Sequence, residues 1–74
     1  MDLWNVGNDA IRAAASRKTG LPLWRMGAVR VTTGLWATCQ VIAGPVVTIY
    51  PHDIRFDDMN VRNEAGAVPL EEVP

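Results

Sequence analysis

Few side chains in this sequence could take part in acid–base chemistry. His52 is the only histidine and stands beside Asp53, a pairing in which a carboxylate can orient an imidazole as a general base. Adjacent residues of an extended segment point to opposite faces, so only a turn would let these two side chains meet. The sequence offers no nucleophile to partner them. We therefore expect no catalytic residue, and the chain is not expected to be an enzyme.

Metal binding is also disfavoured. Asp53, Asp57, Asp58 and Asn60 form an oxygen-rich stretch of the kind that can hold calcium or magnesium, but it lacks the alternating ligands and central glycine of a calcium loop. One cysteine and one histidine cannot form a zinc cage, and one cysteine cannot form an intrachain disulfide. We expect a solvated turn at the acidic stretch, no metal, no cofactor, and a buried structural thiol at Cys39.

Charge is unevenly distributed along the chain. Residues 51–74 carry two arginines against six acidic groups, residues 31–50 carry no charge, and residues 1–30 carry two aspartates against Arg12, Arg17, Lys18, Arg25 and Arg30. Clustered cations beside Trp24 could contact phosphates and stack on a base. The net charge of −1 and the lack of a recognised motif argue against a nucleic-acid partner. In an oligomer, the basic end of one copy could instead meet the acidic end of the next.

The size and composition of the chain favour a protein partner. With 74 residues, 49% of them hydrophobic, the chain forms at most one small domain. Such a domain buries only about 60% of its unfolded surface, and small folds without disulfides or metals usually depend on a partner. Tryptophan is enriched where contacts contribute most to binding. The interface candidates are the three tryptophans and two apolar residues near the C-terminus: Trp4, Trp24, Trp36, Val68 and Leu70.

The residue pattern predicts an α+β fold, with one short N-terminal helix followed by a small antiparallel β meander or small barrel. Residues 8–19 are rich in alanine, a strong helix former, with Gly20 just past the end and Pro22 blocking continuation. Short β-rich segments follow, and they predict strands at about 28–33, 35–43, 46–50 and 54–57.

This pattern also predicts the domain boundary. Residues 1–62 form a single small domain, and the polar, proline-containing residues 63–74 form an extended C-terminal tail. Within the second strand, one face is expected to carry Leu35, Ala37, Cys39, Val41 and Ala43. A mixed face is expected to carry Trp36, Thr38, Gln40 and Ile42, with Trp36 more exposed than Leu35.

A membrane span is the alternative interpretation of the middle of the chain. Residues 31–50 are an uncharged run of about the length of a span, and the basic flank precedes the acidic one, as for an N-terminus in the cytoplasm. Against this alternative, Gly34, Gly44 and Pro45 interrupt a helix, and β-branched residues favour strands. The backbone state of residues 31–50 discriminates between the two, because an open sheet cannot span a bilayer.

Three functional hypotheses follow. The first is a non-catalytic structural or interaction protein, a small subunit of a homo-oligomeric or hetero-oligomeric assembly such as a virion or connector, with residues 63–74 reaching a neighbour as an arm. The second is a single-span membrane accessory subunit. The third is a small inhibitor or regulator that docks on one protein partner. A cytoplasmic or virion location fits the first hypothesis, and a membrane location fits the second.

Overall fold

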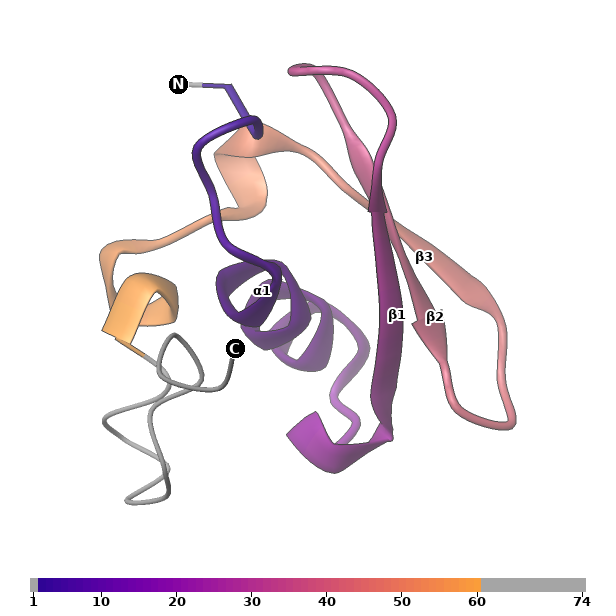
Figure 1. Cartoon of the computed structure of the whole chain (residues 1–74). Coiled ribbons are helices and arrows are strands. Elements are labelled where there is room, and N and C mark those ends of the chain that lie inside the picture. The colour runs from indigo at the N-terminus through magenta and orange to yellow at the C-terminus, as the bar shows by residue number, and fades with distance from the viewer. Residues whose placement is uncertain (1, 61–74) are drawn as a thin grey trace, which may run out of the picture.

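In the computed structural model, which describes residues 2–60, one helix packs against one face of a three-stranded antiparallel sheet (Figure 1). The helix is α1 (Asn8–Thr19), and the strands, in spatial order, are β1 (Met26–Val31), β2 (Ala37–Val41) and β3 (Val46–Ile49). The described chain also contains the 3₁₀ helices η1 (Leu23–Arg25), η2 (Pro51–Asp53) and η3 (Phe56–Asn60). The predicted α+β fold, one helix followed by a small antiparallel meander, is confirmed.

Helix α1 has the bounds that its sequence predicts, residues 8–19. It ends at Gly20, whose φ of 77° lies in the left-handed region that favours glycine and whose N–H donates to the Ser16 carbonyl at 2.9 Å. The face turned toward the sheet is buried and carries mostly small side chains: Ala10, Ile11, Ala14 and Ala15. Small side chains let the helix backbone lie close to the sheet, which suits the thin core of so small a domain.

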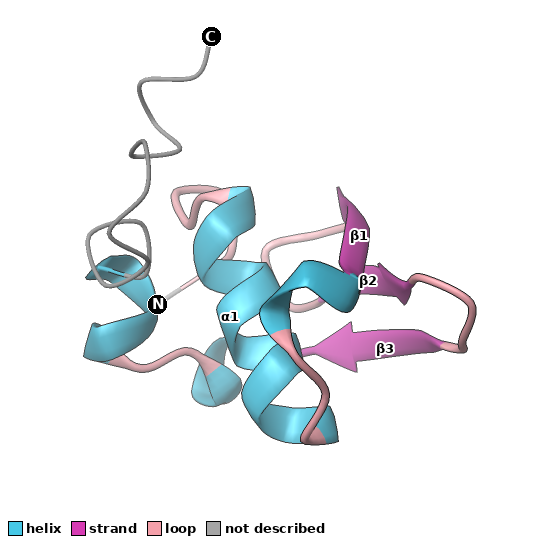
Figure 2. Cartoon of the chain, turned by 90° about the horizontal axis from the view of Figure 1, so that it is seen from below, coloured by secondary structure: helices cyan, strands magenta, loops and turns pink. Residues whose placement is uncertain are grey.

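The sheet contributes one face to the core, and α1 lies on that side of the strands (Figure 2). Cross-strand partners share a face, and the register places Ala37 opposite both Val31 and Ile49. Cys39 lies opposite Val29 and Val47. The core consists of these inward side chains, the buried face of α1 and the N-terminal segment, and its fully buried members of largest volume are Leu3, Ile11, Ile49, Val41 and Cys39.

The fourth strand predicted at about 54–57 is wrong. The chain forms η2 and η3 there instead. Pro51 begins η2, and proline both lacks an N–H and has a φ suited to a helical first turn. Two aspartates then bond nearby backbone N–H groups: Asp53 accepts from Tyr50 at 2.8 Å, and Asp58 accepts from Arg55 at 2.7 Å. Such local bonds compete with a strand ladder, so the alternation of apolar residues was misleading.

The membrane-span alternative is also wrong for this chain. Residues 31–50 contain β2 and β3 rather than a helix, and within residues 2–60 no helix is long and apolar enough to cross a membrane. The other three predicted strands are confirmed, although each is shorter than expected at one or both ends and the first starts earlier, at Met26.

The expected exposures of the residues at the start of β2 need one correction. Ala37, Cys39 and Val41 are buried as predicted. Leu35 lies in the turn before β2 and is 70% exposed, whereas Trp36 is 39% exposed. The expected order is therefore reversed, because the β alternation begins only at the strand and does not extend back to Leu35.

Candidate protein-interaction surface

The face of the sheet that points away from α1 is not covered by any other part of the described chain (Figure 1). Side chains alternate across a strand, so the neighbours of each buried strand residue point to this side. Arg30, Thr38 and Thr48 lie opposite one another across the three strands as one such row. We call this surface the open face, and it comprises the outward residues of the strands and the residues that directly continue β2: Arg30, Trp36, Thr38, Gln40, Ile42, Val46 and Thr48.

The open face carries exposed hydrophobic side chains. Trp36, Ile42 and Val46 are three of the eight large hydrophobic residues that the described chain leaves exposed. Val46, for example, is 55% exposed although it lies within β3. Several exposed apolar side chains on one surface mark an interaction site more often than isolated ones do.

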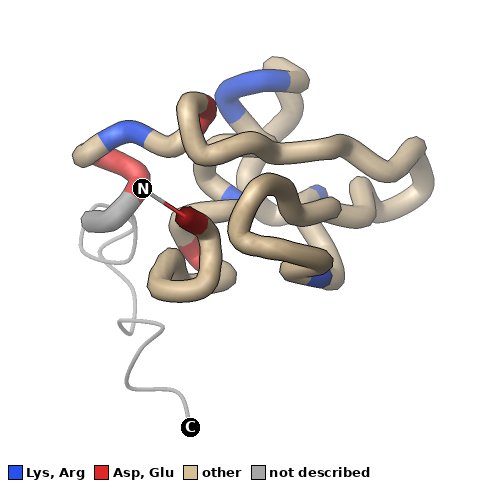
Figure 3. Tube along the Cα trace, turned by 90° about the horizontal axis from the view of Figure 1, so that it is seen from above, with Lys and Arg blue, Asp and Glu red and all other residues tan. Residues whose placement is uncertain are grey.

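The middle of the open face is polar. Gln40 is held in place by its own side chain, whose Nε2 donates to the carbonyls of Gly44 at 2.8 Å and Val41 at 2.9 Å. Arg30 is exposed, and no residue of the described chain forms an ion pair with it. Aromatic residues and arginine are enriched at protein interfaces. Along β2 and β3 the chain is otherwise uncharged, as the long tan stretch of Figure 3 shows.

Two acidic residues after β3, Asp53 and Asp58, form structural contacts instead of the solvated turn that the sequence predicts, whereas Asp57 is exposed. Asp58 is only 4% exposed, and it pairs with Arg17 of α1. Asp53 pairs with Lys18 at 3.1 Å, and the Lys18 ammonium also donates to the Thr48 carbonyl at 3.0 Å. These contacts fasten η2 and η3 to the C-terminal end of α1, where the helix dipole favours the two cations.

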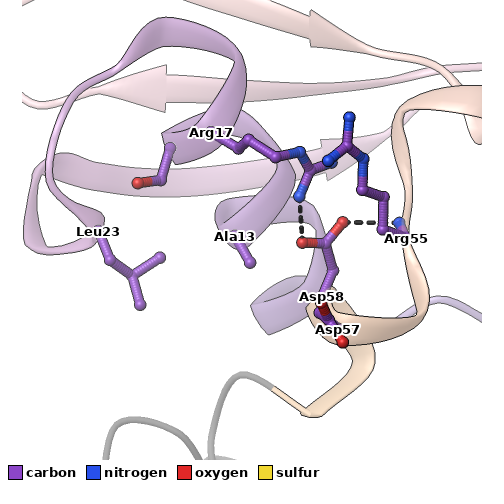
Figure 4. A pocket seen from close by; sticks show the side chains of 7 residues that line it. Ala13, Arg17, Leu23, Arg55, Asp57 and Asp58 are labelled. Carbon is purple, nitrogen blue, oxygen red and sulfur yellow. Dashed lines mark hydrogen bonds and ion pairs between the residues drawn. The ribbon is translucent and has the colours of Figure 1, made fainter.

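A cleft of about 360 Å³ lies beside these contacts. Arg17 and Asp58 point toward one another across it from α1 and η3 (Figure 4), and Leu23 contributes an apolar wall. The hydroxyl of Ser16, at its edge, donates to the Leu21 carbonyl at 2.6 Å. Arg17 and Asp58 are thus committed to one another, and the Ser16 hydroxyl is committed to the backbone.

The turn at η2 does bring His52 and Asp53 together, with 3.6 Å between Nε2 and Oδ1. The imidazole stacks on the Tyr50 ring, with 5.5 Å between centroids. Partial burial opposes ionisation of Asp53, but the Tyr50 N–H and the Lys18 ammonium outweigh it and lower the pKa of Asp53 below its ordinary value. The carboxylate therefore serves to hold the turn.

The remaining candidates for chemistry are the thiol of Cys39 and the possible metal ligands. Cys39 is fully buried, and burial raises the pKa of its thiol in spite of the opposing charge of Arg12. A buried neutral thiol is a weak nucleophile. Within residues 2–60, no group of three histidine, cysteine, aspartate or glutamate side chains is placed to hold a metal ion.

The predicted interface residues are distributed over different parts of the molecule. Trp36 lies on the open face, whereas Trp24, 75% exposed, lies in η1. Trp4 is exposed on one side and packs on Gly34 with the other, since a Cβ on that glycine would lie 2.9 Å from its indole nitrogen. Val68 and Leu70 lie outside the described residues.

The sequence candidates did not include Ile42 or Val46. The alternation along β2 already placed Ile42 beside Trp36 on a mixed face, and that pattern was the available signal. The cross-strand register that adds Val46 to the same face is a tertiary property.

Comparison with protein-family models, with curated proteins and with solved structures finds no match.

Proposed function

We propose that this protein is a non-catalytic structural or interaction protein, a small subunit of an oligomeric assembly, and that the open face is its main contact surface. The observation that carries this proposal is the uncovered sheet face with three large hydrophobic residues exposed on it, Trp36, Ile42 and Val46. A virion or a connector is a setting in which many copies of so small a subunit would meet.

Two further features support this proposal. The described chain supplies one α1-covered face and no second layer for the sheet, and a domain of this size gains much of its stability when a partner covers apolar surface. At the candidate sites for chemistry, the carboxylates of Asp53 and Asp58 are held in internal contacts and the Cys39 thiol is buried.

The test is the mass of the full-length chain in solution, by size-exclusion chromatography with light scattering. We expect a particle of several copies of the 8.1 kDa chain. Val46→Glu places a charge on the open face at a position already exposed, so it should shift the particle toward the monomer while leaving the fold unchanged, as circular dichroism would show. Trp24→Ser is the matched control, because it removes an exposed hydrophobic residue from η1 and should leave the mass unchanged.

Two outcomes would contradict the proposal. A wild-type chain that stays monomeric at every accessible concentration would favour the inhibitor or regulator hypothesis, in which one copy docks on one protein partner. An assembly that survives Val46→Glu but is lost with Trp24→Ser would move the contact from the open face to η1.

A further inference from the structure

The outer edge of β1 has backbone groups that no other described segment uses. The hydrogen bond of Val41 shows which strand residues point their backbone groups toward β1. The Val41 N–H donates to the Pro45 carbonyl, across the β2–β3 turn, at 3.0 Å and so points away from β1. Backbone groups alternate in direction along a strand, so Thr38 faces β1 and bonds its partner Arg30. Val29 and Val31 therefore turn their N–H and C=O groups to the free edge.

Cationic side chains of α1 bond one backbone carbonyl at each of the two edges of the sheet. Arg12 donates through Nε to the Gly27 carbonyl at 2.9 Å, at the start of β1. Lys18 donates to the Thr48 carbonyl on the opposite edge of the sheet, in β3. No comparable side-chain bond within residues 2–60 reaches the backbone of Val29 or Val31. An uncovered stretch of this kind is a template for an added strand.

The charge at this edge determines which strand fits. Pairing β1 with β1 of a second copy, in the two-fold register that uses both Val29 and Val31, would place Arg30 directly opposite its own counterpart. Like charges directly opposite one another destabilise a strand pair, whereas opposite charges stabilise it. The edge therefore favours a short extended segment that carries a carboxylate.

The geometry points to residues 70–73 of a second copy as that segment, and we propose that they add to β1 as a fourth strand with Glu71 or Glu72 opposite Arg30. This inference rests on the proposed function, since it requires that copies meet. The sequence there reads Leu-Glu-Glu-Val between Pro69 and Pro74. Proline has no N–H to donate, so a strand of these four residues is bounded at both ends.

The length of the chain beyond the described residues is sufficient for this contact. Ten residues separate position 60 from position 70 and can span up to roughly 33–36 Å when extended, against 29 Å for the largest extent of the molecule. Figure 1 places η3 on the opposite side of α1 from the sheet. A segment of this length is therefore long enough to reach the β1 edge of a neighbouring copy.

A charge-swap experiment tests this contact in the full-length chain. Arg30→Glu should raise the dissociation constant of the assembly about tenfold, and so should Glu71→Arg with Glu72→Arg. Combining the three substitutions should restore assembly to within about threefold of the wild type. Arg55→Glu is the matched control, because it reverses another exposed arginine outside the sheet and should leave assembly unchanged. Hydrogen exchange at the Val29 and Val31 amides should slow as the protein concentration rises.

The outcomes separate this inference from the proposed function. Assembly that is lost with Val46→Glu but unaffected by Arg30→Glu, or not restored by the triple substitution, overturns the arm contact and leaves the open face as the interface. Slow exchange at Val29 and Val31 that does not depend on concentration means that each tail pairs with its own chain, which overturns the exchange between copies. A chain that is always monomeric overturns both.

Discussion

The contact between Asp58 and Arg17 leads to a quantitative prediction about stability. Asp58 is the one charged residue that the described chain buries almost completely, and its two oxygens accept from the Arg17 guanidinium and the Arg55 N–H (Figure 4). Asp58→Ala removes both acceptors at once. It leaves the guanidinium of Arg17 without its carboxylate and frees η3 from the C-terminal end of α1.

The expected loss follows from the exposure of the two partners. Removing one member of a fully buried ion pair costs about 3–5 kcal/mol, because the other charge remains desolvated. The side chain of Arg17 is 33% exposed, so water can reach it after the substitution. The smaller value for a hydrogen bond to a charged group, about 2 kcal/mol, is therefore the better guide. For a domain of this size a loss of about 2 kcal/mol lowers Tm by roughly 8–16 °C.

The assay is thermal and urea unfolding of the full-length chain, followed by tryptophan fluorescence and circular dichroism. Asp57→Ala is the matched control, since it removes the adjacent carboxylate, which is exposed, and should change stability by less than about 0.5 kcal/mol. A double-mutant cycle with Arg17→Ala should give a coupling energy of about 1 kcal/mol or more. An Asp58→Ala protein as stable as Asp57→Ala would refute the reasoning and show that η3 contributes little to the fold.

Two further predictions concern local contacts. Asp53 has a lowered pKa in the folded protein. Its contribution to stability is therefore fully present above about pH 5 and is lost as the pH falls through the ordinary pKa of the carboxyl and then through its lower folded-state pKa. The difference in unfolding free energy between wild type and Asp53→Asn should shrink over that range, and a difference independent of pH would refute this role of Asp53. Gly20→Ala should lower the free energy of unfolding by about 1 kcal/mol, because φ is positive at that position. Gly7 has a φ of −70° and no atom near an added Cβ, so Gly7→Ala should change stability by less than about 0.5 kcal/mol. Urea unfolding measures both differences.

The sequence by itself determined the elements whose signals are local. The bounds of α1 follow from helix formers that end at Gly20, and the buried face of β2 follows from the alternation of Ala37, Cys39 and Val41. Both signals act within a few residues of the chain, so no knowledge of distant contacts was needed to interpret them.

Only the tertiary structure decided the end of the described domain and the composition of the candidate site. The segment at 54–57 alternates like a strand, but the contact of Asp58 with Arg17, 41 positions away in the chain, favours η3 there. The open face likewise depends on register, because Val46 joins Ile42 and Trp36 only when β3 pairs with β2. Pairing between distant segments depends on the sum of many weak contacts over the whole fold, and no local pattern contains that sum.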